Sequence, residues 1–172
     1  MTIITARPAR VWALGADIDT DQLAPGAYMK LGLDGIAPHC LEATRPEFAA
    51  AVQPGDVIAA GPNFGIGSSR EQAAGALVHL GVQAVIAPSF GGLYFRNAFN
   101  LGLLLLTCAD AGLLKEGESV TLDLEGPNPA VKRADGSTLA CDPIPGFLLE
   151  MVAAGGLLNQ LRQQYDKAST PR

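Results

Sequence analysis

The stretch DVIAAGPNFGIGSSREQAAGALVHL, residues 56–80, predicts a strand, a glycine-rich loop and a helix in direct succession. Residues 56–60 form a short apolar run that is typical of a buried strand. Residues 69–80 instead repeat apolar side chains at helical spacing, and Gly81 marks the end of that helix. The glycine-rich loop therefore follows the carboxyl end of the predicted strand.

Two further strands and a second helix are predicted downstream. Residues 82–87 form a strand-like apolar run, Pro88-Ser89 opens a helix, and residues 103–106 form a third strand after Gly102. This alternation favours right-handed crossovers, which make the strands parallel. Open sheets of this kind bind ligands beyond the carboxyl ends of their strands, where the loop of residues 61–67 is expected.

The flanking segments follow other patterns. Residues 11–14 are strand-like, but residues 15–54 are rich in Gly, Pro and Asp with weak periodicity, which predicts a long functional or mobile loop. Alternation over residues 119–124 and a hairpin signal at Asp135-Gly136 predict appended antiparallel strands. Two helical segments follow, and residues 166–172 are expected to fray. The expected fold is α/β, with a parallel βαβαβ core.

Composition limits the class of protein. With 172 residues, 48% of them hydrophobic, the chain is long enough for one compact domain, which we expect to span residues 1–172. The net charge of −5 argues against nucleic acid and a polybasic membrane surface as partners. The apolar runs are far shorter than the ~20 residues of a membrane span, and the start lacks a signal-peptide core, so a cytoplasmic protein is expected.

The cysteines and histidines do not predict a metal site. Cys40, Cys108 and Cys141 are scattered and odd in number, which fits neither a disulfide framework nor a zinc or iron-sulfur ligand set. Reduced structural thiols are therefore expected. His39 and His79 share no metal-like spacing, and His79 is expected near a helix C-terminus, where it complements the helix dipole.

The loop GPNFGIGSSRE, residues 61–71, has the composition of an anion-binding site. Backbone amides at a helix start and the forked guanidinium of Arg70 suit a carboxylate or a phosphate, and glycines let a ligand approach closely. A dinucleotide-binding fingerprint is excluded because Arg70 stands where its last glycine is required. A P-loop is excluded because no lysine precedes the serines.

A structural alternative for this loop has about equal weight when Ser68 and Glu71 are taken alone. Ser68-x-x-Glu71 matches a capping box, in which the serine hydroxyl bonds the Glu71 amide and the Glu71 side chain reaches back. A cap requires neither the two glycines nor a positive charge in the first turn, where the helix dipole disfavours it. The placement of Arg70 therefore favours an anion site.

A second polar segment, DIDTDQLAP at residues 17–25, has three carboxylates within five residues. An EF-hand is excluded, because the glycine at its sixth position and its distal glutamate are absent. Turn formation by Asp and Thr is favoured over a functional role by roughly two to one. Lys30, which follows this segment, would by itself be an ordinary solvated lysine.

Several motifs in a fixed order carry a family resemblance: DIDTDQ at 17–22, GPNFGIGSSRE at 61–71, Ser89-Phe90, Arg96-Asn97-Ala98 and Asn100-x-Gly102. Over roughly residues 9–165 the chain resembles the small subunits of 3-isopropylmalate dehydratase and homoaconitase, the detached swivelling domain of aconitase. The resemblance implies a β/β/α swivelling fold that docks on a separate large subunit. The large subunit would hold a [4Fe-4S] cluster and most of the catalytic histidines and carboxylates.

The resemblance also implies roles for single residues of the glycine loop. Ser68 would act as an alkoxide base on the carbon beside the hydroxyl-bearing carbon, while Ser69 and Arg70 would hold a substrate carboxylate. A serine is a poor base unless its anion is stabilised, and a helix start together with Arg70 would supply fixed positive potential.

Further implied site residues lie in and after the acidic segment. Asp21 would lie at the edge of the site and orient a basic group. Tyr28 and Lys30 belong to the loop after Pro25, by which relatives distinguish the group on the far carbon of the substrate. Lys30 would either meet a carboxylate there or point outward over the apolar loop.

Three positions depart from the family motif. Ile66 stands where Cys or Glu is usual, Gln72 where His is usual, and Asp17 where Asn is common. Position 66 varies among relatives, whereas Gln72 leaves open a divergent paralogue.

The resemblance predicts the small subunit of a hydro-lyase that isomerises 2-isopropylmalate and 3-isopropylmalate by dehydration and rehydration in leucine biosynthesis. It would be active only with its large subunit and would hold no cofactor of its own. One alternative is a small subunit acting on a related 2-hydroxy acid, such as homocitrate or an alkylmalate. Another is a non-catalytic small-molecule-binding module of the same fold.

Overall fold

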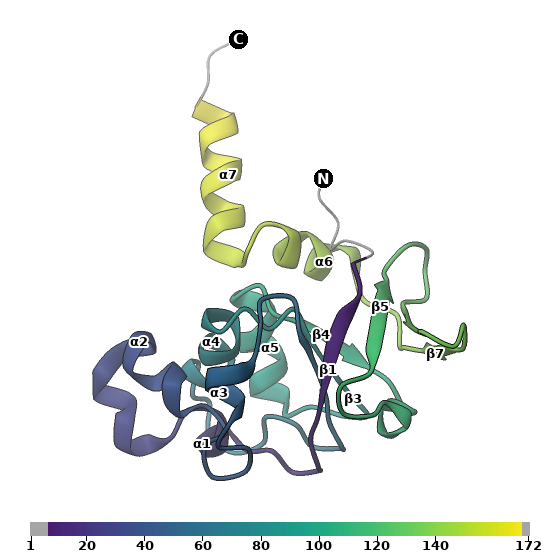
Figure 1. The fold of residues 1–172 in the computed structure, drawn as a ribbon. Helices are drawn as coiled ribbons and strands as arrows, with labels where there is room; N and C mark the ends of the chain where they lie inside the picture. Colours follow the sequence, from purple (N-terminus) through teal and green to yellow (C-terminus); the bar gives the residue numbers. More distant parts are fainter. Residues whose placement is uncertain (1–6, 170–172) are drawn as a thin grey trace.

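The computed structural model describes residues 7–169, and within this range the strands form one sheet of seven (Figure 1). Their order is β4-β3-β2-β1-β5-β6-β7, so β1 stands between a parallel and an antiparallel half. This mixed sheet with helices confirms the predicted α/β class. The strands are β1 (Ala9–Ala13), β2 (Val57–Ala59), β3 (Ala84–Ala87), β4 (Leu104–Thr107), β5 (Ser119–Asp123), β6 (Ala130–Arg133) and β7 (Thr138–Ala140).

The parallel half contains the predicted βαβαβ core. β2 pairs in parallel with β3, and β3 with β4, so that Val85 lies between Ile58 and Leu105. The crossover helices are α4 (Gln72–His79) and α5 (Gly92–Asn100). β1 is a fourth parallel strand beside β2. Because these four strands run in one direction, the loops that follow them lie at the same edge of the sheet.

The antiparallel half also follows the prediction. β5 pairs with β1 and with β6, and β6 pairs with β7, all antiparallel. Between β6 and β7 the expected turn forms at Asp135-Gly136, where Gly136 has a φ of +85°. The Ser137 amide donates to Asp135 Oδ1 over 2.8 Å, which closes this turn. A short 3-10 helix, η3 (Ala111–Leu113), precedes β5.

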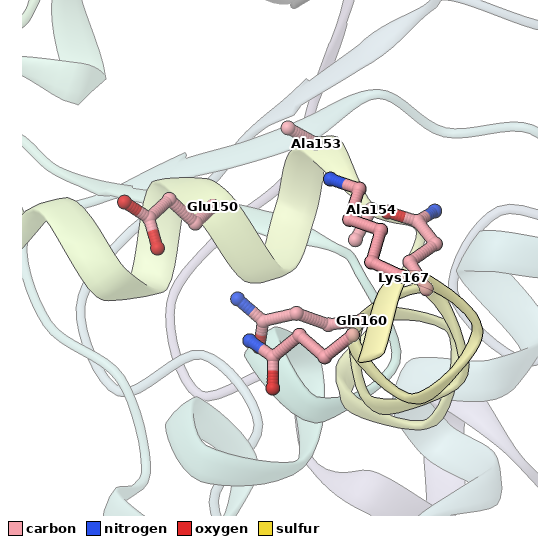
Figure 2. Close-up of a pocket in the computed structure, with 7 residues that line it drawn as sticks. Glu150, Ala153, Ala154, Gln160 and Lys167 are labelled. Atoms are coloured by element: carbon pink, nitrogen blue, oxygen red, sulfur yellow. The ribbon is translucent and has the colours of Figure 1, made fainter. Parts of the chain in front are cut away.

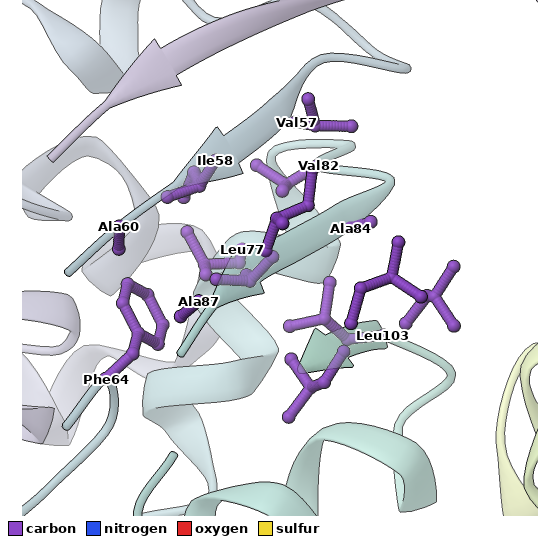
Figure 3. Close-up of a cluster of buried hydrophobic side chains, with 14 of the residues drawn as sticks. Val57, Ile58, Ala60, Phe64, Leu77, Val82, Ala84, Ala87 and Leu103 are labelled. Carbon is purple, nitrogen blue, oxygen red and sulfur yellow. The ribbon is translucent and has the colours of Figure 1, made fainter. Parts of the chain in front are cut away.

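Much of the hydrophobic core lies between the parallel strands and their helices. Figure 3 shows part of it, with Val57 and Ile58 of β2 near Leu77 of α4. Phe64, just beyond β2, is fully buried beside the glycine loop. Each fully buried side chain of this size contributes about 1.5–3 kcal/mol. The core therefore extends to the base of the loop that carries the candidate site.

The prediction of a long loop over residues 15–54 is wrong. The segment folds into α1 (Thr20–Leu23), η1 (Gly26–Leu31), α2 (Gly32–Ile36), η2 (Ala37–His39) and α3 (Phe48–Ala51). Buried Leu23, Ile36 and Phe48 anchor it, and both α1 and α2 pack against α4. Helices of three to six residues are too short to show a 3.6-residue period, so tertiary packing decides their conformation.

The C-terminal segment forms α6 (Gly146–Ala153) and α7 (Leu157–Ser169), and Figure 1 shows α7 projecting away from the sheet. The expected frayed tail over 166–172 is wrong for residues 166–169, which are helical, while residues 170–172 lie outside the described range. Arg162 and Asp166 have the i, i+4 spacing that supports a helix, and Lys167 suits its last turn. Between residues 7 and 169, no helix is long and apolar enough to cross a membrane.

Candidate active site

Three loops meet where β1, β2 and β3 end. The glycine loop after β2 bonds the loop after β1: the Gly65 amide donates to Ile18 O over 2.7 Å, and the Thr20 amide donates to Ile66 O over 2.9 Å. On its other side, the Phe64 amide donates to Ser89 O over 3.1 Å. The structure therefore brings together segments that are far apart in the sequence and that carry most of the predicted site residues.

Two glycines of the loop are required by the protein's own packing. Gly65 has a φ of +77°, and a Cβ built there would lie 2.1 Å from Tyr94 Cγ. Gly67 has a φ of +109°, and its Cβ would lie 3.0 Å from Thr20 Oγ1. Side chains other than glycine are strained at such φ values. The glycines thus let the loop approach Tyr94 and Thr20, a reason that the sequence pattern did not reveal.

Ser68 is exposed, and it forms hydrogen bonds with Thr20 instead of capping a helix. The Ser68 amide donates to Thr20 Oγ1 over 3.2 Å, and the two hydroxyl oxygens lie 3.1 Å apart. α4 begins only at Gln72, and no side chain caps it. The capping-box alternative is therefore wrong, and so is the expectation that the helix starts at position 69. The tertiary contact with Thr20 holds Ser68 ahead of the helix, which weakens the helix-dipole argument for its activation.

Arg70 reaches back to the acidic segment. Its Nη1 donates to Asp21 Oδ1 over 3.0 Å and to Ala24 O over 2.7 Å, and the side chain is partly buried. Asp21 Oδ1 also accepts the Gly26 amide over 3.0 Å. The bond from Arg70, and then the bond from Gly26, lower the pKa of the Asp21 carboxyl. The structure therefore places Asp21 beside a basic group of this same chain.

The other two acidic residues of the segment have structural partners within the protein. Asp19 caps α1 by accepting the Gln22 amide over 2.8 Å. Asp17 has a φ of +58° and accepts from Asn63 Nδ2 over 2.8 Å. Asp17 thus makes a tertiary contact and Asp19 caps a helix, so both have structural roles, but neither lies in the turn that the sequence pattern favoured. Asp21 differs, because it pairs with Arg70.

Asn97 supports the position of Ser69. Ser69 has an exposed side chain, and its carbonyl accepts a 3.1 Å bond from Asn97 Nδ2 on α5. Asn97 is buried, so this bond is the kind of partner that a buried amide requires. Neither Asn97 nor Thr20 was predicted as a site residue, although each lies within one of the ordered motifs.

Comparison with known proteins identifies the family. A family model described as the aconitase C-terminal domain matches residues 46–111. The 3-isopropylmalate dehydratase small subunit of Nautilia profundicola is 43% identical over 161 residues, which cover 92% of this chain and 94% of that protein. The methanogen homoaconitase small subunit of Methanothermobacter thermautotrophicus is 43% identical over 159 residues, 91% of each chain. The chain belongs to this family of small subunits.

A solved structure supports the same assignment. The 3-isopropylmalate dehydratase structure from Methanocaldococcus jannaschii aligns with a TM-score of 0.86 at 37% identity, covering 94% of this chain and 96% of that one. The predicted resemblance to the small-subunit family is confirmed. With it, the mixed sheet and its helices are the fold of an aconitase C-terminal domain.

In this family member, η1 is the segment expected to determine substrate specificity, and it begins next to the Arg70–Asp21 pair. A Cβ at Gly26, the first residue of η1, would lie 3.4 Å from Asp21 Oδ1 and 3.9 Å from Arg70 Nη2. Further along η1, the Tyr28 ring stacks on His39 with centroids 3.5 Å apart.

The contacts of Tyr28 and Lys30 differ. The charge of Glu42, burial and a hydrogen bond to Glu42 raise the pKa of the Tyr28 phenol. His39 Nδ1 lies 2.6 Å from Glu42 Oε2, so the three side chains form one cluster. Lys30 is exposed. The structure thus engages Tyr28 with His39 and Glu42 and leaves Lys30 facing solvent.

The described residues of this small-subunit family member do not fit an iron-sulfur cluster. Between residues 7 and 169, no group of three or more His, Cys, Asp or Glu side chains is placed to hold a metal ion. Burial raises the pKa of the Cys40 thiol to about 12, and burial with the nearby Cys108 raises that of Cys141 to about 12. Cluster ligation requires thiolates, which these sites disfavour.

An open cavity of about 450 Å³ lies between α6 and α7 and is shown in Figure 2. It is lined by side chains that include Glu150, Gln160 and Lys167. Figure 1 shows α6 and α7 at the end of the sheet opposite α1, so this cavity is separate from the three loops of the candidate site.

Proposed function

We propose that this chain is the small subunit of a hydro-lyase that interconverts 2-isopropylmalate and 3-isopropylmalate in leucine biosynthesis. The observation that carries the proposal is the glycine loop, in which an exposed serine, Ser68, stands two residues from a guanidinium that Asp21 orients. The names of several similar relatives support this choice of reaction. A cytoplasmic location, without nucleic acid or membrane partners, belongs to the same proposal.

In the proposed mechanism, Ser68 acts as the base. Its oxygen, as the anion, takes the proton from the carbon beside the hydroxyl-bearing carbon, and the electron pair forms a carbon–carbon double bond as hydroxide leaves. Water then adds back with the hydroxyl on the neighbouring carbon. Arg70 and Ser69 hold a substrate carboxylate, which fixes the reacting carbon near Ser68.

The second half of the site would come from a large subunit. Hydroxide is a poor leaving group, and the described part of this chain offers no Lewis acid for it. We propose that a [4Fe-4S] cluster on the large subunit supplies that Lewis acid. Ser68 and Ser69 are exposed, as residues that meet a substrate at the boundary of two subunits must be before assembly.

Related hydroxy acids are the other candidate substrates. The homoaconitase small subunit among the relatives favours a homologous tricarboxylate as the second candidate, because exposed Lys30 is free to approach an additional carboxylate. An alkylmalate other than isopropylmalate belongs to the same class. A non-catalytic binding module of this fold is the alternative that retains the anion site without turnover.

The test is an assay of this chain reconstituted with its large subunit against a panel of 2-hydroxy dicarboxylates and tricarboxylates. We expect turnover of isopropylmalate, and we expect Ser68→Ala to abolish it. The exposed Ser119 on β5 provides the control variant Ser119→Ala, which should keep full turnover. Turnover of no hydroxy acid would contradict an enzymatic role. Near-normal turnover by Ser68→Ala would contradict the base assignment.

A further inference from the structure

We propose that Thr20 is a positioning residue for Ser68, and that its hydroxyl donates a hydrogen bond to the Ser68 oxygen as negative charge develops there. The inference rests on the proposed function, because it assigns a partner to the proposed base. Thr20 belongs to the polar segment at 17–25, for which the sequence pattern alone favoured turn formation.

One hydroxyl of Thr20 contacts Ser68 twice. Thr20 Oγ1 accepts the Ser68 amide over 3.2 Å and lies 3.1 Å from Ser68 Oγ. Thr20 is only 3% exposed, whereas the Ser68 side chain faces solvent. The contact therefore approaches the Ser68 oxygen from the protein side and leaves its other side open to a substrate.

Thr20 is held in place by groups outside the reacting side chains. Its amide donates to Ile66 O over 2.9 Å, and its carbonyl accepts the Ala24 amide over 3.0 Å. It is the first residue of α1, which Asp19 caps. Gly67 leaves room for the hydroxyl, since a Cβ there would lie 3.0 Å from Thr20 Oγ1. The donor is thus preorganised before any substrate binds.

The direction of the hydrogen bond follows from the charge. While Ser68 carries its proton, either hydroxyl can donate to the other. Once Ser68 has lost that proton to solvent, only Thr20 has a hydrogen to donate, and the bond becomes charge-assisted. Thr20 keeps its own proton throughout. Because the bond strengthens as the anion forms, it stabilises the reactive state of Ser68 rather than bound substrate.

The experiment compares Thr20→Val, Thr20→Ser and Thr121→Val in the reconstituted pair with isopropylmalate. Thr20→Val keeps the side-chain shape and removes the hydroxyl, and we expect kcat to fall about 10- to 100-fold with KM nearly unchanged. The pH profile of kcat should move to higher pH, since Ser68 loses a donor to its anion. Thr20→Ser should restore most of the activity. Thr121, on β5, provides the same substitution in the antiparallel half and should have no effect.

Each outcome either supports or overturns the proposed role of the Thr20 hydroxyl. A kcat of Thr20→Val within about twofold of the wild type, or a Thr20→Ser as impaired as Thr20→Val, would overturn the role of the hydroxyl. A loss of activity that only matches a loss of assembled complex, with the pH profile unmoved, would assign Thr20 a structural role instead. If Thr20→Val does not assemble, Thr20→Ala compared with Thr20→Ser replaces it. An inactive wild-type pair would overturn the proposed function itself.

Discussion

The Arg70 guanidinium is oriented by Asp21, which lies 49 residues away in the sequence: Arg70 Nη1 and Asp21 Oδ1 are 3.0 Å apart. Asp21 follows β1 and Arg70 follows β2, so the pair joins two neighbouring strand ends across the site. Asp21 is 70% exposed, and an ion pair this accessible contributes little to folding stability. The Arg70–Asp21 ion pair should therefore affect substrate binding more than folding stability.

The first prediction concerns Arg70. We expect Arg70→Lys to raise KM by about tenfold or more with a smaller change in kcat, because lysine keeps the charge but loses the planar fork that binds a carboxylate through two bonds. Steady-state kinetics of the reconstituted pair measures this. Asp21→Asn should raise KM less, since it only loosens the guanidinium. An unchanged KM in Arg70→Lys would show that this side chain does not meet the substrate.

Local sequence signals determine part of this fold, and tertiary packing determines the rest. β2, β3, β4 and the Asp135-Gly136 hairpin were predicted, because apolar runs and turn residues act over a few neighbouring positions. The short helices of residues 20–51 were not predicted, because their conformation depends on packing against α4.

In the candidate site too, some features follow from local sequence and others depend on tertiary contacts. The composition of the glycine loop, which suits the binding of an anion, was visible in the sequence, and so was the position of Ser68 in that loop. Whether Ser68 caps a helix or bonds Thr20 depends on a residue 48 positions away, and no local pattern contains that information. The reason for Gly65 is equally non-local, since Tyr94 occupies the space that its side chain would need.

The second prediction uses Gly65 to test how tightly the loop is packed. Gly65→Ala should destabilise the chain by about 3 kcal/mol or more, because the new Cβ would meet the Tyr94 ring and the φ of +77° is unfavourable for alanine. Gly126→Ala is the matched control: its φ is +80°, but nothing lies within 4 Å of its Cβ position. It should cost only about 1 kcal/mol. Urea denaturation measures the free energy of unfolding of both variants. Equal losses of stability would show that the Tyr94 ring moves aside to accommodate the new Cβ.

The third prediction concerns the dependence of stability on pH. Burial alone would raise the pKa of Asp56, but bonds from Arg10, the Gln53 amide and Trp12 outweigh burial and lower it. All of them reach Oδ2, with Trp12 Nε1 at 2.9 Å. A lowered pKa in the folded state gives stability that is present above the unfolded pKa of about 3.9 and lost as pH falls through the folded pKa.

Asp56→Asn should therefore reduce the free energy of unfolding by about 2 kcal/mol at pH 7. The difference from the wild type should shrink as the pH falls below about 4. Urea unfolding at several pH values measures both. Asp110→Asn, an exposed carboxylate just before η3, is the control and should change little. A difference that stayed constant down to pH 3 would contradict the role of the Asp56 charge.

The fourth prediction addresses substrate choice through Lys30, an exposed residue in the last turn of η1. Lys30→Val removes a charge that would attract an additional carboxylate and offers an alkyl group an apolar surface. We expect kcat/KM for a tricarboxylate to fall about three- to tenfold relative to an alkylmalate. Lys115→Val, on another exposed lysine, is the control. Equal changes for both substrates would show that Lys30 does not discriminate.

The last prediction concerns residues 26–38, which contain η1 and α2 and begin beside Arg70. η1 has no buried residue and α2 has one, Ile36, whereas α4 buries five of its eight. Local opening requires little free energy where few apolar contacts are lost, so this segment should exchange its amide hydrogens faster than α4 in the isolated chain.

Binding of the large subunit should cover the site face, and the segment should then gain protection as the two halves close over substrate. Hydrogen exchange measured by mass spectrometry, on the chain alone and in the reconstituted pair, tests this directly. The gain at 26–38 should exceed the gain at 72–79, which is protected in both states by its burial in the core. If residues 26–38 were already fully protected in the isolated chain, or if that chain turned over substrate by itself, then a site completed by the large subunit would have to be abandoned.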